Sequence, residues 1–293
     1  MSSSSLFTAA CIQLCSGREV GPNIEAASAL IEEAARAGAQ FIATPETTSL
    51  MELERRALLE KTFAEDDDPA LAAFRQLAQA HRIWLLIGSL LVKTSGEKLA
   101  NRSFLLSPDG EIAARYDKIH MFDVDLDGGE SYRESKNYEA GAEAVTAALP
   151  LGGAGGLVGL SICYDLRFPY LYRMLAQAGA GVLTVPAAFT QQTGEAHWHV
   201  LLRARAIETG CFVVAPAQSG LHETGRATYG HSLIVGPWGD VLADGGEGPG
   251  VVMADIDMAE VARARGRVPA LTHDRPVRLC ETLASGHKVR TVQ

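Results

Sequence analysis

Short apolar segments alternate with amphipathic segments along this 293-residue chain, and this alternation constrains the fold more than any other feature. Segments 41–44 and 212–215 have the length of buried strands, whereas 22–37 repeats its apolar residues at helical spacing. Asp68 and Pro69 supply a cap and a first turn for a helix over 70–81. The pattern predicts a layered α/β fold in which helices cover sheets. The other predicted strands are 7–14, 84–90, 103–107, 157–162, 182–185 and 231–235.

Composition favours a single large domain. Hydrophobic residues make up 47% of the chain, enough to bury a substantial core, and no Pro- or Ser-rich linker divides it. We expect one domain over 1–293, with its core over about 6–276 and a C-terminal tail over 277–293. The glycine-rich segments 152–156 and 244–250 are short enough to be turns, and 152–156 lacks the Lys-Ser/Thr end of a phosphate-binding loop.

Charge and hydropathy exclude several classes of partner. The net charge of -9 argues against broad attraction to nucleic acid or to an anionic membrane. The longest apolar run, 83–92, is far shorter than the roughly 20 residues of a membrane span. Residues 2–5 lack a basic flank, so we expect no signal peptide and a cytoplasmic location.

The five cysteines show no paired spacing, which suits free thiols in a reducing compartment. Cys11 and Cys15 are four residues apart in the first predicted strand and are expected in the core. Cys211 opens an apolar run and is also expected in the core. Cys280 completes the set.

Cys163 has a different context. It ends an apolar run that turns directly into a polar segment, and Pro169 can open the helix that follows. A sulfur near a helix N-terminus is favoured as thiolate, so this is a candidate nucleophile, although a free cysteine can also simply fill space. Two distant segments supply a carboxylate at Glu46 and a cation at Lys118.

These segments resemble motifs of the nitrilase superfamily of carbon-nitrogen hydrolases. The matches are Pro45-Glu46, Lys118-Ile-His-Met-Phe-Asp123 and Gly159-Leu-Ser-Ile-Cys-Tyr-Asp-Leu-Arg-Phe-Pro169. Further matching segments are 186–190, 194–198, 201–208, 229–232 and 237–239, so the resemblance spans about Thr8 to Pro276. It implies a four-layer αββα sandwich that pairs through its helices into an αββα-αββα homodimer or a higher homo-oligomer.

The resemblance also assigns catalytic roles for amide hydrolysis. Cys163 is the nucleophile, Glu46 the proton carrier, and Lys118 with the backbone N–H of Tyr164 the binding site for the oxyanion. Glu134 matches the second glutamate of the family, which positions the lysine. Composition alone favours a solvated loop carboxylate for Glu134. We expect no cofactor and no metal.

The segments around Cys163 and 201–208 look most like the branch that contains deaminated glutathione amidase and omega-amidase. There, an arginine and a threonine matching Arg167 and Thr193 hold a substrate carboxylate, and Phe189 would line the pocket. A bidentate arginine selects a carboxylate at a fixed distance from the attacked amide. A salt bridge from Arg167 to Asp165 is the structural alternative.

The expected function is therefore hydrolysis of the amide bond in a small carboxylate-bearing substrate, such as deaminated glutathione or a 2-oxo acid ω-amide, to an acid and ammonia or an amine. A nitrilase, an aliphatic amidase and an N-carbamoyl amidohydrolase remain alternatives within the superfamily. A catalytically silent binding protein is an alternative from another class.

A calcium-binding protein is a further alternative, because Asp123 to Glu134 fits the letters of an EF-hand loop. The flanking segments 113–122 and 137–144 do not read as the two helices that an EF-hand requires.

His197 and His199 are two residues apart on a predicted helix over 195–208 and so point to different sides, which argues against a shared metal. The family usually has glutamate where His199 stands. Arg203 and Arg205 are predicted on a solvated or subunit-contacting helix face.

Overall fold

The computed structural model describes residues 5–126, 129, 131–151, 156–278, 280–283 and 286–289. Several sequence predictions lie outside this range: residues 2–4 of the N-terminal segment, three positions of the calcium pattern (Asp127, Gly128 and Glu130) and residues 152–155 of the glycine-rich turn.

Two large β-sheets form the centre of the molecule. The first contains, in spatial order, β17 (Gly250–Asp257), β1 (Leu6–Gln13), β2 (Phe41–Ala43), β3 (Trp84–Lys93), β4 (Leu99–Leu106) and β5 (Ile112–Asp117), with β8 (Tyr138–Glu139) paired to β4. The second contains β16 (Val241–Asp244), β15 (Leu233–Val235), β12 (Phe212–Ala215), β11 (Val182–Thr184), β10 (Leu157–Gly159) and β9 (Thr146–Ala148). Strands β1, β2 and β3 are parallel, as are β10, β11 and β12.

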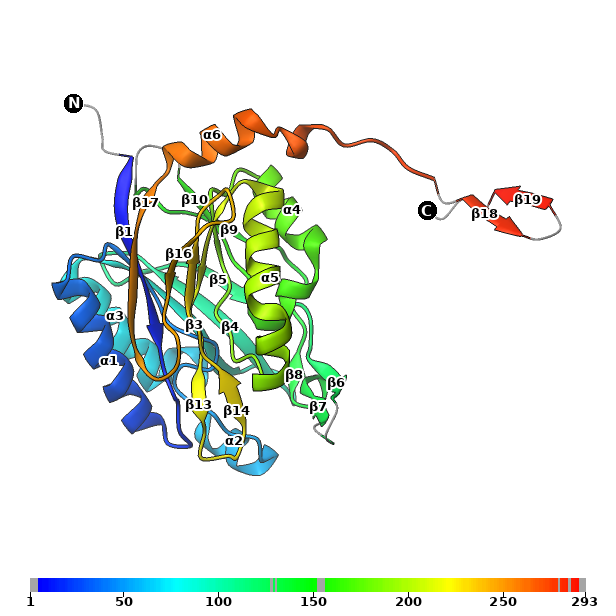
Figure 1. The fold of residues 1–293 in the computed structure, drawn as a ribbon. Coiled ribbons are helices and arrows are strands. Elements are labelled where there is room, and N and C mark those ends of the chain that lie inside the picture. Colours follow the sequence, from blue (N-terminus) through cyan, green and yellow to red (C-terminus); the bar gives the residue numbers. More distant parts are fainter. Residues whose placement is uncertain are drawn as a thin grey trace.

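Helices cover the outer faces of both sheets (Figure 1). The first sheet is covered by α1 (Val20–Arg36) and α3 (Pro69–His81), and the second by α4 (Pro169–Gln177) and α5 (Gln191–Thr209). The other helices are α2 (Arg55–Lys61) and α6 (Ala259–Arg267), with short 3-10 turns η1 (Glu65–Asp67), η2 (Glu134–Lys136), η3 (Cys163–Arg167) and η4 (Ala270–Thr272). The arrangement is the four-layer αββα sandwich that the sequence predicts.

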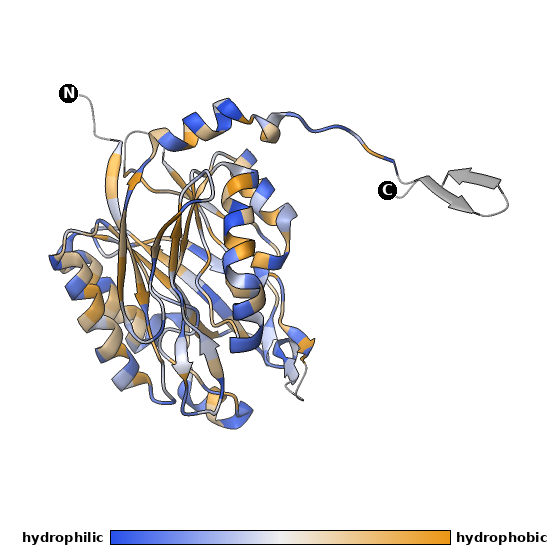
Figure 2. Ribbon diagram, in the orientation of Figure 1, coloured by the Kyte–Doolittle hydropathy of each residue, from blue (hydrophilic) through white to orange (hydrophobic). Residues whose placement is uncertain are grey.

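Side-chain alternation in β1 explains how one strand serves two cores. Phe7, Ala9 and Cys11 face the second sheet, whereas Ala10 and Ile12 face α1 and α3. The central strands carry mostly apolar residues, whereas apolar and polar residues alternate along the helices (Figure 2). A sheet covered on both faces needs this pattern, because each of its surfaces is buried.

Most predicted elements are confirmed within a few residues. The Asp68 side chain caps α3 by accepting from the backbone N–H groups of Ala70 and Leu71, as its position before Pro69 suggests. Strand β10 ends at Gly159, earlier than predicted. The expectation for Cys15 is wrong: β1 ends at Gln13, so strand alternation no longer applies, and Cys15 is exposed. Cys11 and Cys211 are buried as predicted.

Three small hairpins complete the structure: β6 (Asp123–Asp125) with β7 (Ser131–Arg133), β13 (Ser219–Leu221) with β14 (Ala227–Tyr229), and β18 (Cys280–Leu283) with β19 (Gly286–Val289). The last hairpin lies on a tail that extends away from the sandwich (Figure 1). In the described part of the chain, no helix combines the length and apolar character needed to cross a membrane.

Candidate active site

Glu46, Lys118 and Cys163 come together because all three follow strands. Glu46 lies in the loop after β2, Lys118 directly follows β5, and Cys163 lies in the turn after β10. Glu46 and Cys163 thus belong to different sheets and meet at the carboxyl ends of parallel strands, the usual position of sites in α/β folds. All three side chains are buried, with relative exposures of 3%, 1% and 7%.

The Glu46 loop is held close to β3 by a glycine. A Cβ on Gly88 would lie 2.0 Å from the carbonyl oxygen of Thr44, so a larger residue could not occupy this position without moving the loop. The Glu46 carboxylate accepts from Asn101 Nδ2 at 3.0 Å and from the backbone N–H of Ala188 at 3.1 Å. These donors fix its orientation.

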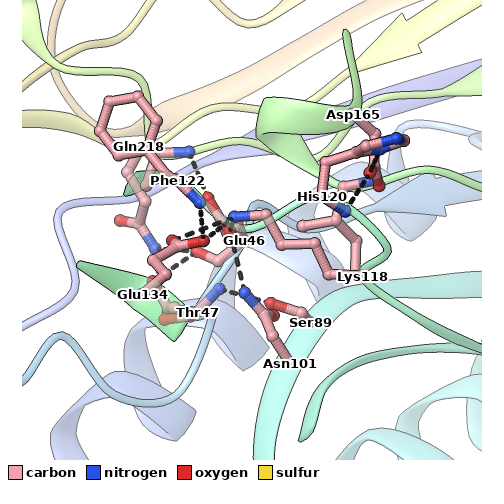
Figure 3. A network of polar contacts seen from close by, with 12 residues as sticks. Glu46, Thr47, Ser89, Asn101, Lys118, His120, Phe122, Glu134, Asp165 and Gln218 are labelled. Atoms are coloured by element: carbon pink, nitrogen blue, oxygen red, sulfur yellow. Dashed lines mark hydrogen bonds and ion pairs between the residues drawn. The ribbon is translucent and has the colours of Figure 1, made fainter. Parts of the chain in front are cut away.

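Lys118 lies between two carboxylates (Figure 3). Its Nζ is 2.8 Å from Glu46 Oε1 and 2.8 Å from Glu134 Oε2, and Glu134 also accepts from the backbone N–H of Phe122. Burial alone would lower the pKa of Lys118, but the two carboxylates outweigh burial and raise it well above its usual value. Lys118 is therefore a buried, permanently charged ammonium. Glu134 is part of this network and is not a solvated loop residue.

Cys163 has a left-handed backbone conformation, with φ of 49°, which is uncommon for a residue with a side chain. Its thiol lies next to the Glu46 carboxylate, and each group shifts the pKa of the other. Burial and the nearby Glu46 charge raise the pKa of Cys163 well above its usual value, although Lys118 opposes them.

The raised pKa of the Cys163 thiol does not support the expected thiolate in the free site. Cys163 begins the short turn η3, and the α-helix that follows it in the sequence starts only at Pro169. The carboxylate is the ionised partner instead. Burial would raise the pKa of Glu46, but the charge of Lys118 and hydrogen bonds from Lys118 and Cys163 lower it overall.

Asp165 connects the lysine segment to the cysteine turn. Its fully buried carboxylate accepts from Tyr116 Oη at 2.6 Å, from the backbone N–H of Ile162 at 2.9 Å and from the backbone N–H of His120 at 3.0 Å. These bonds fix Lys118 and Cys163 relative to each other through their chain neighbours. Asp165 is thus a partner of these groups, and the alternative of a salt bridge with Arg167 is not observed.

The prediction for Arg205 is wrong. Arg205 is only 5% exposed, and its guanidinium donates two hydrogen bonds to the carbonyl oxygen of Leu166 within η3. The residue lies on the inner side of α5, where it supports the turn that carries Cys163. Arg203 is exposed, as predicted.

A narrow pocket beside Cys163 contains the predicted binding residues. Tyr164, Arg167, Phe189 and Thr193 all line it with Cys163. The Arg167 guanidinium lies 5.4 Å from the centre of the Phe189 ring, and its Nη1 is 3.3 Å from His197 Nδ1. The half-buried guanidinium is thus held beside the reactive group by contacts with a ring and an imidazole.

A larger cavity of about 270 Å³ opens on the other side of Glu46. Glu134, Ala188 and Arg226 line both spaces. Arg226 donates to the carbonyl oxygen of Ala188, and its guanidinium lies 5.1 Å from the centre of the Tyr132 ring. Its buried Nε has no hydrogen-bond partner among the described residues. Arg226 therefore places a positive charge where the two cavities meet, and this charge can bind an anionic group of a substrate.

Asn101 and Arg226 were missed in the sequence. Asn101 had a detectable signal, because it is a polar residue inside the otherwise apolar strand β4. Arg226 lies in the loop between β13 and β14, and nothing in its local pattern points to Glu46, which is distant in sequence.

The calcium alternative is contradicted. An EF-hand loop lies between two helices. Here the proposed loop contains strands β6 and β7, and it is preceded by β5 and followed by the short turn η2 and β8. The three described acidic residues already have other partners: Asp125 pairs with Arg133, Asp123 accepts from the backbone N–H of Ser135, and Glu134 pairs with Lys118.

His197 and His199 point to different partners, as their spacing predicts. His197 contacts Arg167, whereas His199 Nε2 lies 3.1 Å from Asp244 Oδ2 on the last strand of the second sheet.

The fold and the site together define an enzyme with a buried thiol, a carboxylate and an ammonium at the edge of an αββα sandwich. The chain belongs to the carbon-nitrogen hydrolase family, whose model matches residues 8–266. It is thus an amidase-type hydrolase of carbon-nitrogen bonds other than peptide bonds.

Its curated relatives agree with this assignment. The chain is 41% identical over 270 residues to deaminated glutathione amidase of Synechocystis sp., covering 91% of this chain and 97% of the relative. It is 39% identical to deaminated glutathione amidase of Homo sapiens, covering 94% of this chain and 84% of the relative.

Solved structures support the fold. The NitFhit protein of Caenorhabditis elegans aligns with a TM-score of 0.86 at 36% identity, covering 93% of this chain and 66% of that one. Nit3 of Saccharomyces cerevisiae, a member of branch 10 of the nitrilase superfamily, aligns with a TM-score of 0.80 at 25% identity, covering 92% and 96%.

Proposed function

We propose that the chain is a cysteine-dependent amidase that cleaves a small amide bearing carboxylates, through a thioester on Cys163. The observation that carries the proposal is the arrangement of the Cys163 thiol against ionised Glu46, with Lys118 beside them and Arg167 and Arg226 in the adjoining cavities. This set supplies a nucleophile, a proton carrier, a stabiliser of negative charge and two anchors for anionic groups.

In the acylation step, Cys163 Sγ bonds to the amide carbon while its proton moves to Glu46. The negative charge that develops on the carbonyl oxygen is stabilised by Lys118 and by the backbone N–H of Tyr164. Glu46 then donates the proton to the nitrogen, the carbon-nitrogen bond breaks, and ammonia or an amine leaves. The acyl group remains on Cys163 as a thioester.

In the deacylation step, Glu46 accepts a proton from a water molecule, whose oxygen attacks the thioester carbon. Collapse of the second tetrahedral intermediate breaks the carbon-sulfur bond. The proton returns from Glu46 to sulfur, the carboxylic acid leaves, and the free thiol is restored. One carboxylate therefore carries a proton in both halves of the reaction.

The acidities of the two groups constrain the timing. The pKa of Cys163 is raised and that of Glu46 is lowered, so proton transfer from thiol to carboxylate is unfavourable in the free enzyme. Attack and proton transfer must therefore be coupled, because the oxyanion beside Lys118 forms only when the carbon-sulfur bond forms. A protonated resting thiol also protects the cysteine from oxidation.

Deaminated glutathione is a candidate substrate, because the relatives are named after it and because its charged groups match the two arginines. It carries a carboxylate on each side of the amide that would be cleaved. Arg167 in the narrow pocket and Arg226 at the junction with the larger cavity would each bind one of them. An ω-amide of a 2-oxo acid has only the carboxylate on the acyl side and would use one anchor.

The experiment is a substrate panel assayed for release of ammonia or amine. It contains deaminated glutathione, a 2-oxo acid ω-amide, a neutral aliphatic amide, a nitrile and an N-carbamoyl amino acid. We expect the highest kcat/KM for an amide with a carboxylate on the acyl side. A preference for the nitrile, the carbamoyl compound or the neutral amide would contradict the proposal.

A further inference from the structure

Two histidines and an aspartate converge at a place that the proposed chemistry does not use. His199 lies on α5, His231 lies in the segment between β14 and β15, and Asp244 is the last residue of β16. His199 Nε2 is 3.1 Å from Asp244 Oδ2, and His231 Nδ1 is 2.9 Å from Asp244 Oδ1. All three ligand atoms lie within 4.8 Å of one another.

The cluster is held in place by backbone contacts. The N–H of Gly246 donates to Asp244 Oδ1 at 2.9 Å, and the N–H of His231 donates to the carbonyl oxygen of Gly246 at 2.7 Å. Trp198 Nε1 donates to the carbonyl oxygen of His231 at 2.8 Å. His231 has φ of 53°, an uncommon conformation that these bonds maintain.

An aromatic ring limits the motion of His231. The Tyr229 ring is stacked on the imidazole, with centroids 4.4 Å apart and an interplanar angle of 22°. The side chains of His199, His231 and Asp244 are 32%, 23% and 35% exposed, so solvent and ions can reach them. A metal site needs ligand atoms that are held in place by surrounding contacts and are accessible from solvent on one side.

We propose that His199, His231 and Asp244 form a binding site for a divalent zinc-type metal ion, outside the Cys163 centre. Two imidazoles and one carboxylate are a common ligand set for Zn²⁺, with a water in the fourth position. Tetrahedral Zn²⁺ with bonds of about 2.0–2.1 Å sets its ligand atoms ~3.3 Å apart. The two nitrogen-oxygen separations, 3.1 Å to Oδ2 and 2.9 Å to Oδ1 of Asp244, are a few tenths of an ångström shorter than this. The ion would enter if the side chains shifted so that one carboxylate oxygen and both nitrogens surround it.

Asp244 also borders a cavity. A cavity of about 330 Å³ begins at Asp244 and is also lined by Gln13 and Glu247. A bound ion would link α5 to the end of β16 and to the segment after β14. Helix α5 carries Thr193, which lines the narrow pocket, so the ion would stabilise one wall of that pocket without touching Cys163.

His199 completes the set of ligands. With a carboxylate at 199, the cluster would have one imidazole and two carboxylates, a set with less affinity for zinc-type ions.

The test uses the full chain, freed of metal by a chelator and titrated with Zn²⁺ in a calorimeter. His199→Gln is the informative variant, because its amide can still donate a hydrogen bond to Asp244 but does not replace an imidazole as ligand. We expect one Zn²⁺ per chain for the unmodified protein and binding weakened about a hundredfold or more in His199→Gln. His273→Gln, which removes an exposed histidine elsewhere, should leave binding unchanged.

Co²⁺ distinguishes this site from the cysteines. Visible absorption bands of Co²⁺ bound to nitrogen and oxygen, without the sulfur charge-transfer band of a thiolate, are expected for the unmodified protein and should be lost in His199→Gln. Equal binding by both proteins, a thiolate spectrum, or no zinc binding below about 1 mM would overturn the proposal. None of these outcomes bears on hydrolysis, because Cys163, Glu46 and Lys118 remain unchanged.

Discussion

Cys163 and Glu46 are adjacent groups whose acidities are shifted in opposite directions. Glu46 is kept ionised by Lys118 and its hydrogen bonds, while burial keeps the Cys163 thiol protonated. In the proposed mechanism, the active form therefore has a carboxylate and a thiol. The reverse assignment, a thiolate with a protonated glutamate, would need a cation closer to sulfur than to Glu46.

The pH dependence follows from this assignment. In the proposed mechanism, activity requires Glu46 above its lowered pKa and Cys163 below its raised pKa, so kcat/KM should be flat over the whole range between the ordinary pKa of a glutamate and that of a cysteine. Asn101→Ala removes a donor to the Glu46 carboxylate, which raises the pKa of Glu46 and moves the acidic limb to higher pH. A midpoint near pH 7 in the unmodified enzyme would contradict the assignment.

The substrate anchor is tested by Arg167→Lys, which keeps the charge but loses the planar pair of donors. A charge-assisted contact in a buried setting is worth roughly 2–5 kcal/mol. We therefore expect kcat/KM for a carboxylate-bearing amide to fall about a hundredfold. The measurement compares this substrate with a neutral amide of the same length in both proteins.

The neutral amide is the control, because it should react poorly with the unmodified enzyme and change little in Arg167→Lys. An equal loss for both substrates would mean that Arg167 supports the cysteine turn and does not recognise a carboxylate.

The sequence allowed Glu46, Lys118 and Cys163 to be predicted because each one ends or follows an apolar strand within a recognisable motif. Arg226 could not be predicted, because its role depends on which loops meet at Glu46. The direction of the pKa shift of Cys163 could not be predicted for a similar reason, because it depends on burial and on the neighbouring Glu46 carboxylate. A turn beside a carboxylate and a turn beside a helix terminus have similar sequences but opposite effects on acidity.

At the scale of elements, α5 supports the cysteine turn through Arg205. Its guanidinium contacts the Leu166 carbonyl oxygen through two donors and lies 5.4 Å from the centre of the Tyr172 ring. The sequence placed Arg205 on an outer face because arginines are usually exposed. Helical position alone does not reveal that a buried carbonyl lies opposite.

Arg205→Met should therefore destabilise the protein by about 1–3 kcal/mol, because it leaves a buried acceptor unpaired. It should also lower kcat by loosening the turn that carries Cys163. Arg203→Met, two residues away and exposed, is the matched control. The checks are urea unfolding and steady-state kinetics. If both variants behaved alike, Arg205 would have no special link to η3.

The alternation of strands and helices was enough to predict the layers, since each apolar face needs a cover. It could not predict strand ends. Strand β10 stops at Gly159, where a Cβ would lie 3.0 Å from both Leu175 and Leu183. That close approach is set by α4 and β11 and has no local signature.

At the scale of the whole molecule, the helical face of the second sheet carries large exposed apolar residues. These are Tyr170 and Met174 on α4, Val200 and Ile207 on α5, and nearby Trp238. Such a surface is typical of an interface. Together with the pairing implied by the family resemblance, it leads us to expect a homodimer that joins two sandwiches through these helices.

Val200→Glu combined with Ile207→Glu should therefore shift the protein from dimer to monomer, because each charge would be buried unpaired. Light scattering coupled to size-exclusion chromatography measures the mass directly. Leu221→Glu, an equally exposed apolar residue on the β13–β14 hairpin, serves as the control. An unmodified protein that elutes as a monomer would contradict the expectation.

The most direct test of the account is hydrolysis by Cys163→Ala compared with Cys211→Ala. Both residues are buried cysteines, so loss of sulfur from a buried site is common to both variants. Release of ammonia or amine from the preferred amide is measured on purified, folded proteins. The account predicts no turnover above background for Cys163→Ala and near-normal turnover for Cys211→Ala. Hydrolysis retained in Cys163→Ala would contradict it.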